Sequence, residues 1–168
     1  MNLDHYKFCS MCGGGLKRKG LNLRCTKCDF VNYQNARPTA TAIIMKGNKV
    51  LLVKRAEEPY LGWWDLPAGY VGRGESPEDT LRREMKEELG ISIKFKKFLG
   101  TYPGTATSGP DRFYILSLVY LITPVGTPKV VDKKEVQEFT WFSKNDFPKR
   151  IAFDSNRDIV RDFLKIWK

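Results

Sequence analysis

The chain has 168 residues, a net charge of +10 and 42% hydrophobic residues, which suits one substantial domain plus a small appendage. No apolar run is long enough for a transmembrane helix, and no repeat or low-complexity segment is visible, so membrane-spanning and repeat classes are excluded. The N-terminus lacks the apolar run of a signal peptide, and we therefore expect a cytoplasmic protein.

All four cysteines lie near the N-terminus as two Cys-x-x-Cys pairs, Cys9 with Cys12 and Cys25 with Cys28. Two such pairs separated by twelve residues indicate a tetrahedral zinc site with four thiolate ligands. The alternatives are two disulfides or four free thiols, but a reducing compartment favours metal binding. Four thiolates leave no open coordination position, so we expect this zinc to be structural.

A zinc ribbon is expected over residues 1–36, and it is too short to build a core of its own, so the metal must hold it together. The boundary is placed near Asn32–Pro38, and a larger domain is expected over residues 37–168. Residues 1–37 carry seven Lys or Arg against two Asp, a net charge of +5. A basic surface suits a polyanionic substrate or RNA, although it also occurs on soluble proteins without such a partner.

The first strands of the larger domain are predicted within Ala40–Arg55. Two apolar segments there flank Lys46-Gly47-Asn48, and glycine and asparagine favour a tight hairpin turn.

A short helix is predicted after Ser76, a favourable N-cap residue, with Pro77 at the first helical position. Gly90 is a natural stop for this helix. The apolar stripe that docks the helix consists of Leu81, Met85 and Leu89.

Three carboxylates, Glu84, Glu87 and Glu88, share one face of this helix because they are spaced i, i+3 and i+4. Like charges at this spacing destabilise a helix, and a hard divalent cation such as Mg²⁺ relieves the repulsion. The alternative interpretation is a solvated acidic face, the usual meaning of a run of charges.

The remaining elements are three strands and a terminal helix. The helix is predicted over Arg157–Trp167, with Ser155 and Asp158 forming a start that resembles a capping box. The strands are predicted over Ile91–Tyr102, Arg112–Ile122 and Val136–Phe142.

The helix and its preceding loop match the signature of the Nudix hydrolases, and the segment Gly62–Gly69 (GWWDLPAG) resembles the entry to that signature. The matching positions are Gly69, Glu75, Arg83, Glu84, Met85, Glu87, Glu88, Gly90 and Ile91. The resemblance implies an α/β/α sandwich with a mixed sheet, preceded here by the four-cysteine zinc ribbon. It also implies hydrolysis of a nucleoside diphosphate linked to another moiety, with Mg²⁺ or Mn²⁺ as cofactor.

By the same resemblance, Glu87 and Glu88 are metal ligands, and Glu84 is a ligand or the general base. Glu75 supports the loop or binds a further metal, and Arg83 positions Glu84. Metal ions neutralise the diphosphate and lower the pKa of a bound water, whose proton a carboxylate accepts.

Gly69 is expected to let the backbone turn sharply into the loop. Some family members take their base from a later loop, and the candidates here are Glu135 and Glu138. Their alternative interpretation is as polar positions of a strand.

The chain resembles a zinc-ribbon-bearing group of this family. It is partly similar to the NADH pyrophosphatase branch, but Phe98–Tyr114 does not match the motif that follows the signature in that branch. The resemblance therefore leaves three substrate classes open, namely ADP-ribose, dinucleotides and nucleoside triphosphates. A homodimer is compatible with the resemblance.

Candidate substrate-binding residues are Trp63 and Tyr102, whose rings suit stacking on a nucleobase, and Arg73, a loop arginine suited to phosphate. Buried aromatic packing and a solvated arginine are the competing interpretations. Two further hypotheses are hydrolysis of modified RNA 5′ ends and a nucleotide- or nucleic-acid-binding module on the same scaffold.

Overall fold

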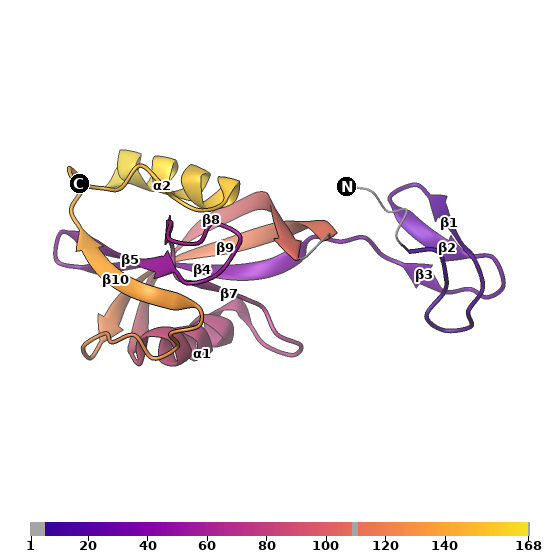
Figure 1. Ribbon diagram of the computed structural model, residues 1–168, viewed down its shortest axis with the longest axis horizontal. Helices are drawn as coiled ribbons and strands as arrows, with labels where there is room; N and C mark the ends of the chain where they lie inside the picture. Colours follow the sequence, from indigo (N-terminus) through magenta and orange to yellow (C-terminus); the bar gives the residue numbers. More distant parts are fainter. Residues whose placement is uncertain (1–5, 109–110, 168) are drawn as a thin grey trace. The chain divides into compact units, whose positions relative to one another are not determined.

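The computed structural model describes residues 6–108 and 111–167 and divides the chain into two compact units, Met1–Ala36 and Arg37–Lys168 (Figure 1). No helix in the described residues is long and apolar enough to cross a membrane.

The first unit is a three-stranded antiparallel sheet in the order β1-β2-β3. Its strands are β1 (Leu16–Lys19), β2 (Asn22–Cys25) and β3 (Val31–Asn32). Cys9 and Leu23 are the buried hydrophobic residues in its described part. So small a core agrees with a unit that depends on a metal for its stability.

The second unit is built on a seven-stranded mixed sheet in the order β10-β5-β4-β9-β8, with β6 pairing β5 and β7 pairing β4. The β4–β9 pairing is parallel and the other pairings are antiparallel. The strands are β4 (Arg37–Lys46), β5 (Lys49–Arg55), β6 (Trp64–Asp65), β7 (Ala68–Tyr70), β8 (Ser92–Ser108), β9 (Asp111–Val125) and β10 (Val136–Phe142).

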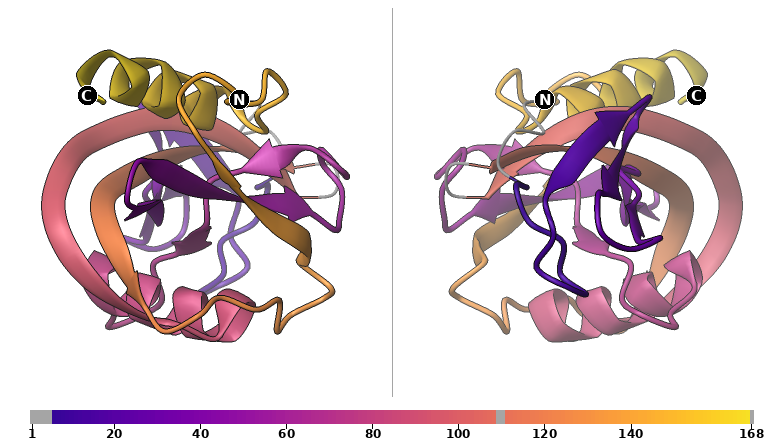
Figure 2. Two further views of the ribbon diagram at one scale, coloured as in Figure 1. Left: turned by 90° about the vertical axis from the view of Figure 1, so that its left-hand side faces the viewer. Right: turned by 90° about the vertical axis from the view of Figure 1, so that its right-hand side faces the viewer.

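One helix covers each face of this sheet: α1 (Pro77–Leu89) on one side and α2 (Asp154–Ile166) on the other. Figure 2 shows β8 and β9 curving strongly between the two helical layers. This arrangement confirms the predicted α/β/α sandwich with a mixed sheet.

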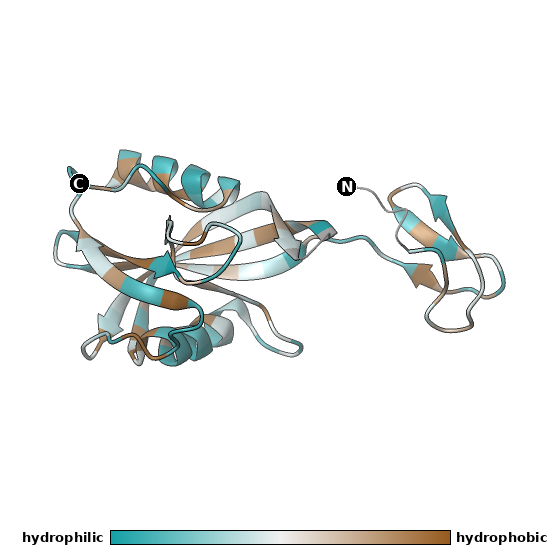
Figure 3. Ribbon diagram, in the orientation of Figure 1, coloured by the Kyte–Doolittle hydropathy of each residue, from teal (hydrophilic) through white to brown (hydrophobic). Residues whose placement is uncertain are grey.

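The central strands are buried on both faces, since their alternate residues enter two separate cores. Ile44 of β4 and Leu51 of β5 pack under α1, whereas Ile43 and Leu52 pack under α2. The outer surface of α1 is mainly hydrophilic (Figure 3), as expected for a helix that docks by one stripe.

The ends of α1 are as the sequence predicts. Ser76 accepts a hydrogen bond from the Asp79 backbone N–H, and Asp79 completes a capping box with the Ser76 backbone N–H. Gly90 ends the helix in the left-handed conformation, with φ of 64°.

The predicted start of the terminal helix is wrong. α2 begins at Asp154, not at Arg157, and its N-cap is Phe153, which makes no side-chain capping bond. Just before the helix, the Ala152 backbone N–H donates a hydrogen bond to the Trp64 backbone oxygen. Phe153 follows with a positive φ of 57°, so the chain turns abruptly into the helix. Ser155 is only 2% exposed and caps nothing.

The strands β8 and β9 extend beyond their predicted ends, whereas the hairpin between β4 and β5 turns at the predicted Gly47 and Asn48. The fifteen residue pairs between β8 and β9 supply the backbone partners that prolong both strands.

Candidate active site and zinc centre

The four cysteines of the first unit converge, with their Sγ atoms all within 4.8 Å of one another and no disulfide. The Cys12 Sγ lies 3.4 Å from that of Cys28 and 3.5 Å from that of Cys25, and the Sγ atoms of Cys9 and Cys28 are 3.8 Å apart. Zn–S bonds of about 2.3 Å in a tetrahedron place sulfur atoms about 3.8 Å apart. The donor set therefore fits zinc.

Backbone N–H groups point at two of these sulfurs, as suits thiolates that carry negative charge. Met11 N–H donates to Cys9 Sγ at 3.4 Å, and Lys27 N–H donates to Cys25 Sγ at 3.3 Å. A Cβ at Gly14 would lie 2.9 Å from the Lys27 side chain and 3.0 Å from Cys25 Sγ, so only glycine fits there without a shift.

In the second unit, Glu75 and Arg83 lock the loop that precedes α1. Arg83 donates to both carboxylate oxygens of Glu75, at 2.7 and 3.0 Å. Glu75 also accepts from the Gly72 backbone N–H at 2.9 Å and from the Thr80 hydroxyl at 3.0 Å. The bonds from Arg83, followed by the others, lower the pKa of Glu75 to about 2. Glu75 thus joins Gly72 of the loop that precedes α1 to Thr80 and Arg83 of the helix.

Arg83 also reaches two of the acidic residues on its own helix. It donates to Glu84 at 2.6 Å and to Glu87 at 3.1 Å. A single guanidinium therefore neutralises part of the charge on this face and orients Glu84.

The close approach of Glu84 to β7 explains Gly69. A Cβ at Gly69 would lie 2.1 Å from Glu84 Oε1, so no larger residue fits without displacing that carboxylate. Gly69 lies in a strand, paired with Ala40, and is absent from the glycines with positive φ. The sharp turn expected at Gly69 is therefore not its role, because the residue makes room for a carboxylate.

The three carboxylates on the shared face of α1 are buried to different extents. Glu87 is exposed, Glu84 is half-buried, and Glu88 is 5% exposed. The Oε2 atom of Glu88 is buried and has no hydrogen-bond partner in the described part of the chain. Burial, together with the charges of Glu84 and Glu135, raises the pKa of Glu88 well above its ordinary value.

A buried carboxylate with an unsatisfied oxygen needs a proton or a cation. A divalent cation fits this donor set, because hard metal ions prefer carboxylate oxygens. Among the described residues, only the four cysteines form a group of three or more side chains close enough together to hold a metal ion. The acidic side chains would therefore have to move closer together around such a cation.

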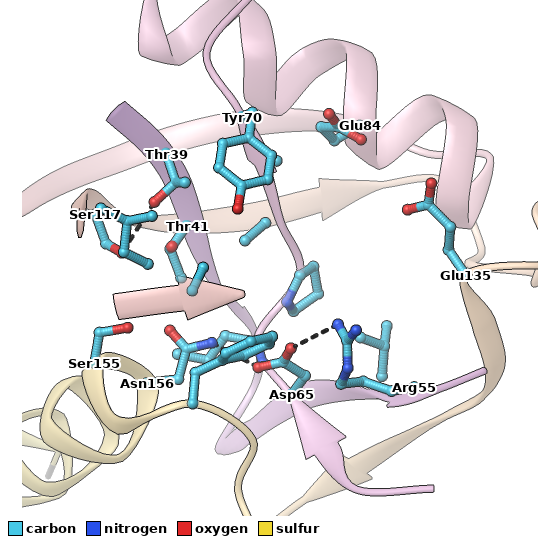
Figure 4. Close-up of a pocket in the computed structure, with 18 of the residues that line it drawn as sticks. Thr39, Thr41, Arg55, Asp65, Tyr70, Glu84, Ser117, Glu135, Ser155 and Asn156 are labelled. Carbon is cyan, nitrogen blue, oxygen red and sulfur yellow. Dashed lines mark hydrogen bonds and ion pairs between the residues drawn. The ribbon is translucent and has the colours of Figure 1, made fainter. Parts of the chain in front are cut away.

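Glu84 and Glu88 open onto a cavity of about 1180 Å³, which Figure 4 shows with Glu84 and Glu135 on one side. Glu135 lines this cavity just before β10, and its backbone oxygen accepts from Ala56 N–H at 2.9 Å. Burial raises the pKa of Glu135, with Asp132 and other acidic neighbours adding to the rise. Glu138 is exposed, forms an ion pair with Lys54 at 3.0 Å and does not line the cavity.

The opposite end of the cavity is a polar recess that sequence reasoning missed (Figure 4). Asp65 Oδ1 accepts from Asn156 Nδ2 at 2.6 Å and from Leu66 N–H at 3.0 Å, and Arg55 lies 3.5 Å from Oδ2. Thr39 donates to Ser117 at 3.0 Å in the same wall. The sequence does signal this recess through the adjacent polar residues Ser155 and Asn156 at the start of α2. A helix-capping role accounts equally well for Ser155, so the sequence alone does not point to a pocket.

The three substrate-binding candidates do not line the cavity. Trp63 packs against Tyr60, with ring centroids 5.3 Å apart, and Tyr102 packs against the core beneath α2. Arg73 lies in the loop between β7 and α1.

Replacing Cys25 with serine is expected to abolish tight zinc binding and to unfold residues 6–36, because a hydroxyl is a poor zinc ligand and the unit has little core. The larger unit, with its own two cores, should melt unchanged. Zinc content per chain and limited proteolysis measure these effects, with Ser10→Ala as the control. A Cys25→Ser first unit that resists protease without metal would contradict the assignment.

Asp65 should make stability depend on pH. Burial raises its pKa from 3.8 to about 7, against the opposing charge of Arg55, so the folded state holds an extra proton between these values. Stability from this group is therefore present at low pH and is lost as the pH rises from about 4 to about 7, by on the order of 4 kcal/mol.

The variant Asp65→Asn cannot titrate and keeps an oxygen for Asn156 and Leu66. Urea unfolding of both proteins from pH 4.5 to 8 should show the wild type losing stability relative to Asp65→Asn. Parallel pH profiles would show that Asp65 keeps an ordinary pKa.

Comparison with known proteins identifies the family. Residues 35–163 match the NUDIX domain family. The chain is 37% identical over 140 residues to a Methanocaldococcus jannaschii protein named ADP-ribose pyrophosphatase, covering 81% of this chain and 77% of that protein. It is 26% identical over 168 residues to a Pseudomonas putida protein named NAD-capped RNA hydrolase NudC, covering 96% of this chain but only 56% of that protein.

Among solved structures, a NUDIX hydrolase from Nitrosomonas europaea is 27% identical, with a TM-score of 0.75, over 95% of this chain and 90% of its own. The family match spans the seven-stranded sheet, α1 with its acidic face and most of α2, and the chain belongs to the Nudix hydrolase family.

Proposed function

We propose that this protein is a metal-dependent pyrophosphohydrolase that cleaves a nucleoside diphosphate linked to another moiety, such as ADP-ribose, a dinucleotide or a nucleoside triphosphate. The observation that carries the proposal is the buried, unpartnered Glu88 oxygen beside Glu84, at the wall of a cavity large enough for a nucleotide. A reducing cytoplasmic location and a structural zinc in the first unit complete the proposal.

In this proposal Glu84, Glu87 and Glu88 hold Mg²⁺ or Mn²⁺. When bound, the metal neutralises the diphosphate, polarises a phosphoryl oxygen and makes water more acidic. Arg83 orients Glu84 and Glu87, and Glu75 keeps Arg83 in place through its paired hydrogen bonds.

Glu135 is the general base of this proposal. It faces the cavity, and its raised pKa brings it closer to the operating pH, where proton transfer is most efficient. Glu138 pairs with Lys54 and does not line the cavity, so the structure supports Glu135 over Glu138.

The polar recess suits the nucleoside part of the substrate. The Asp65–Asn156 pair presents donors and acceptors from two elements far apart in sequence, inside a buried pocket. Groups of this kind recognise the edge of a planar base, because an unmatched polar group there would lose its hydrogen bonds.

A second candidate function is hydrolysis of modified RNA 5′ ends. It is favoured by the exposed cations of the first unit, Lys17, Arg18, Lys19 and Arg24, and by the relatives named NAD-capped RNA hydrolases. If RNA is the substrate, its affinity for the protein should fall steeply as the salt concentration is raised. A pure binding module is disfavoured, because it would not need all three carboxylates on α1.

The central test is nucleotide hydrolysis with Mg²⁺ and then Mn²⁺ over a panel of ADP-ribose, NADH, dinucleoside polyphosphates, triphosphates and capped short RNA. Glu87→Gln should lower kcat/KM for the preferred substrate at least about 100-fold, a loss of about 2.7 kcal/mol of transition-state stabilisation. Because Glu87 is exposed, the melting temperature should stay unchanged. Wild-type turnover by Glu87→Gln would refute the metal assignment.

The choice of base is tested by a matched pair of substitutions on either side of the start of β10. Glu135→Gln should lower kcat by roughly 100-fold or more and remove the acidic limb of the pH–rate profile, because the general base is gone. Glu138→Gln should keep kcat within about twofold, since it loses only a surface ion pair. Equal effects of the two substitutions would exclude Glu135 as the base.

A further inference from the structure

One of the arginines that line the cavity, Arg37, differs from the other two in having no partner for its charge in the described part of the chain. Its wall contains six carboxylates and three arginines, Arg37, Arg55 and Arg83. Arg55 is engaged by Asp65 and the Pro59 backbone oxygen, and Arg83 is engaged by the acidic residues around α1. Among the described residues, Arg37 has neither an ion-pair nor a hydrogen-bond partner.

Arg37 is nevertheless held in a defined position. Its guanidinium carbon lies 3.8 Å from the centroid of the Phe113 ring, which is 6% exposed. The parallel pairing of β4 with β9, where Arg37 stands opposite Ile115, brings the two residues together. Stacking uses the flat face of a guanidinium and leaves its N–H edges available, an arrangement that suits bidentate binding of a phosphate.

Tyr70 connects this position to the acidic face of α1. It directly follows Gly69, against which Glu84 packs, and its ring centroid lies 6.3 Å from that of Phe113. Its side chain points into the cavity between Glu84 and the opposite wall (Figure 4), and about half of it is exposed. An accessible ring beside an unpaired cation suits a planar base that carries a phosphate.

We propose that Arg37 and Tyr70 form a subsite for a phosphate that lies outside the scissile pyrophosphate, next to a planar base. This subsite rests on the proposed function and narrows its substrate class to nucleotides with such an additional phosphate. The same chemistry occurs in a dinucleotide with a phosphorylated ribose and in the first phosphodiester after the 5′ nucleotide of an RNA.

Substrate pairs that differ by one added phosphate, alone or as part of one added nucleotide, test the subsite. NADP⁺ is compared with NAD⁺, and NAD-capped dinucleotide RNA is compared with NAD⁺, with kcat and KM measured separately. At least one phosphate-bearing substrate should be preferred by roughly 10-fold or more in kcat/KM, mainly through KM, as expected for one charge-assisted bidentate contact. Which pair shows the preference distinguishes the ribose phosphate from the RNA diester.

Arg37→Gln should reduce that preference to about one while leaving kcat for NAD⁺ within about twofold. Arg37→Lys should retain part of it, because the charge stays and the planar fork is lost. Arg150→Gln, an exposed arginine outside the cavity, should keep the full preference. Melting curves of all variants show whether the fold is retained.

Binding without turnover separates this subsite from the proposed function. Calorimetry is carried out with adenosine 2′,5′-bisphosphate, adenosine 3′,5′-bisphosphate and AMP. The wild type should bind one bisphosphate at least about 10-fold more tightly than AMP, and Arg37→Gln should lose this difference in affinity. If this binding pattern is found but no substrate is hydrolysed, the proposed hydrolase activity is refuted and the subsite is supported. Equal binding of all three ligands by the wild type, or an unchanged preference in Arg37→Gln, would overturn the subsite.

Discussion

The burial of the Glu88 carboxylate beside Glu84 is the constraint on which the site depends. Removing an ionised carboxylate from water is costly unless a proton, a hydrogen-bond donor or a cation compensates. Arg83 compensates Glu84 and Glu87, but it leaves Glu88 Oε2 without a partner. The surrounding structure must therefore hold a group that is unfavourable by itself, and a helix anchored by an apolar stripe and capped at both ends can do so.

The sheet brings residues of several strands to the cavity beside that helix. Because β4 pairs with β9 in parallel and with β7 antiparallel, residues of all three strands line one cavity. Arg37 lines the same cavity as Asp65 and Asn156 of the polar recess. The acidic face of α1 borders this cavity through Glu84 and Glu88.

The elements were largely predictable because their signals are local. The capping residues Ser76 and Gly90, the turn at Gly47 and the spacing of the four cysteines each act within a few residues. The start of α2 was not predictable in this way. Ser155 has the chemistry of a capping residue, but backbone bonds to Trp64 start the helix earlier and direct Ser155 into the cavity.

The sequence by itself determined the family, the four-cysteine donor set and the helix that carries Glu84, Glu87 and Glu88, because each depends on short-range spacing. Only the tertiary structure decided which carboxylate is buried, that Glu135 faces the cavity and Glu138 does not, and that Asp65 meets Asn156. It also showed that Gly69 makes room for Glu84. These facts depend on contacts between residues up to 91 positions apart, and on burial, for which a linear pattern has no signal.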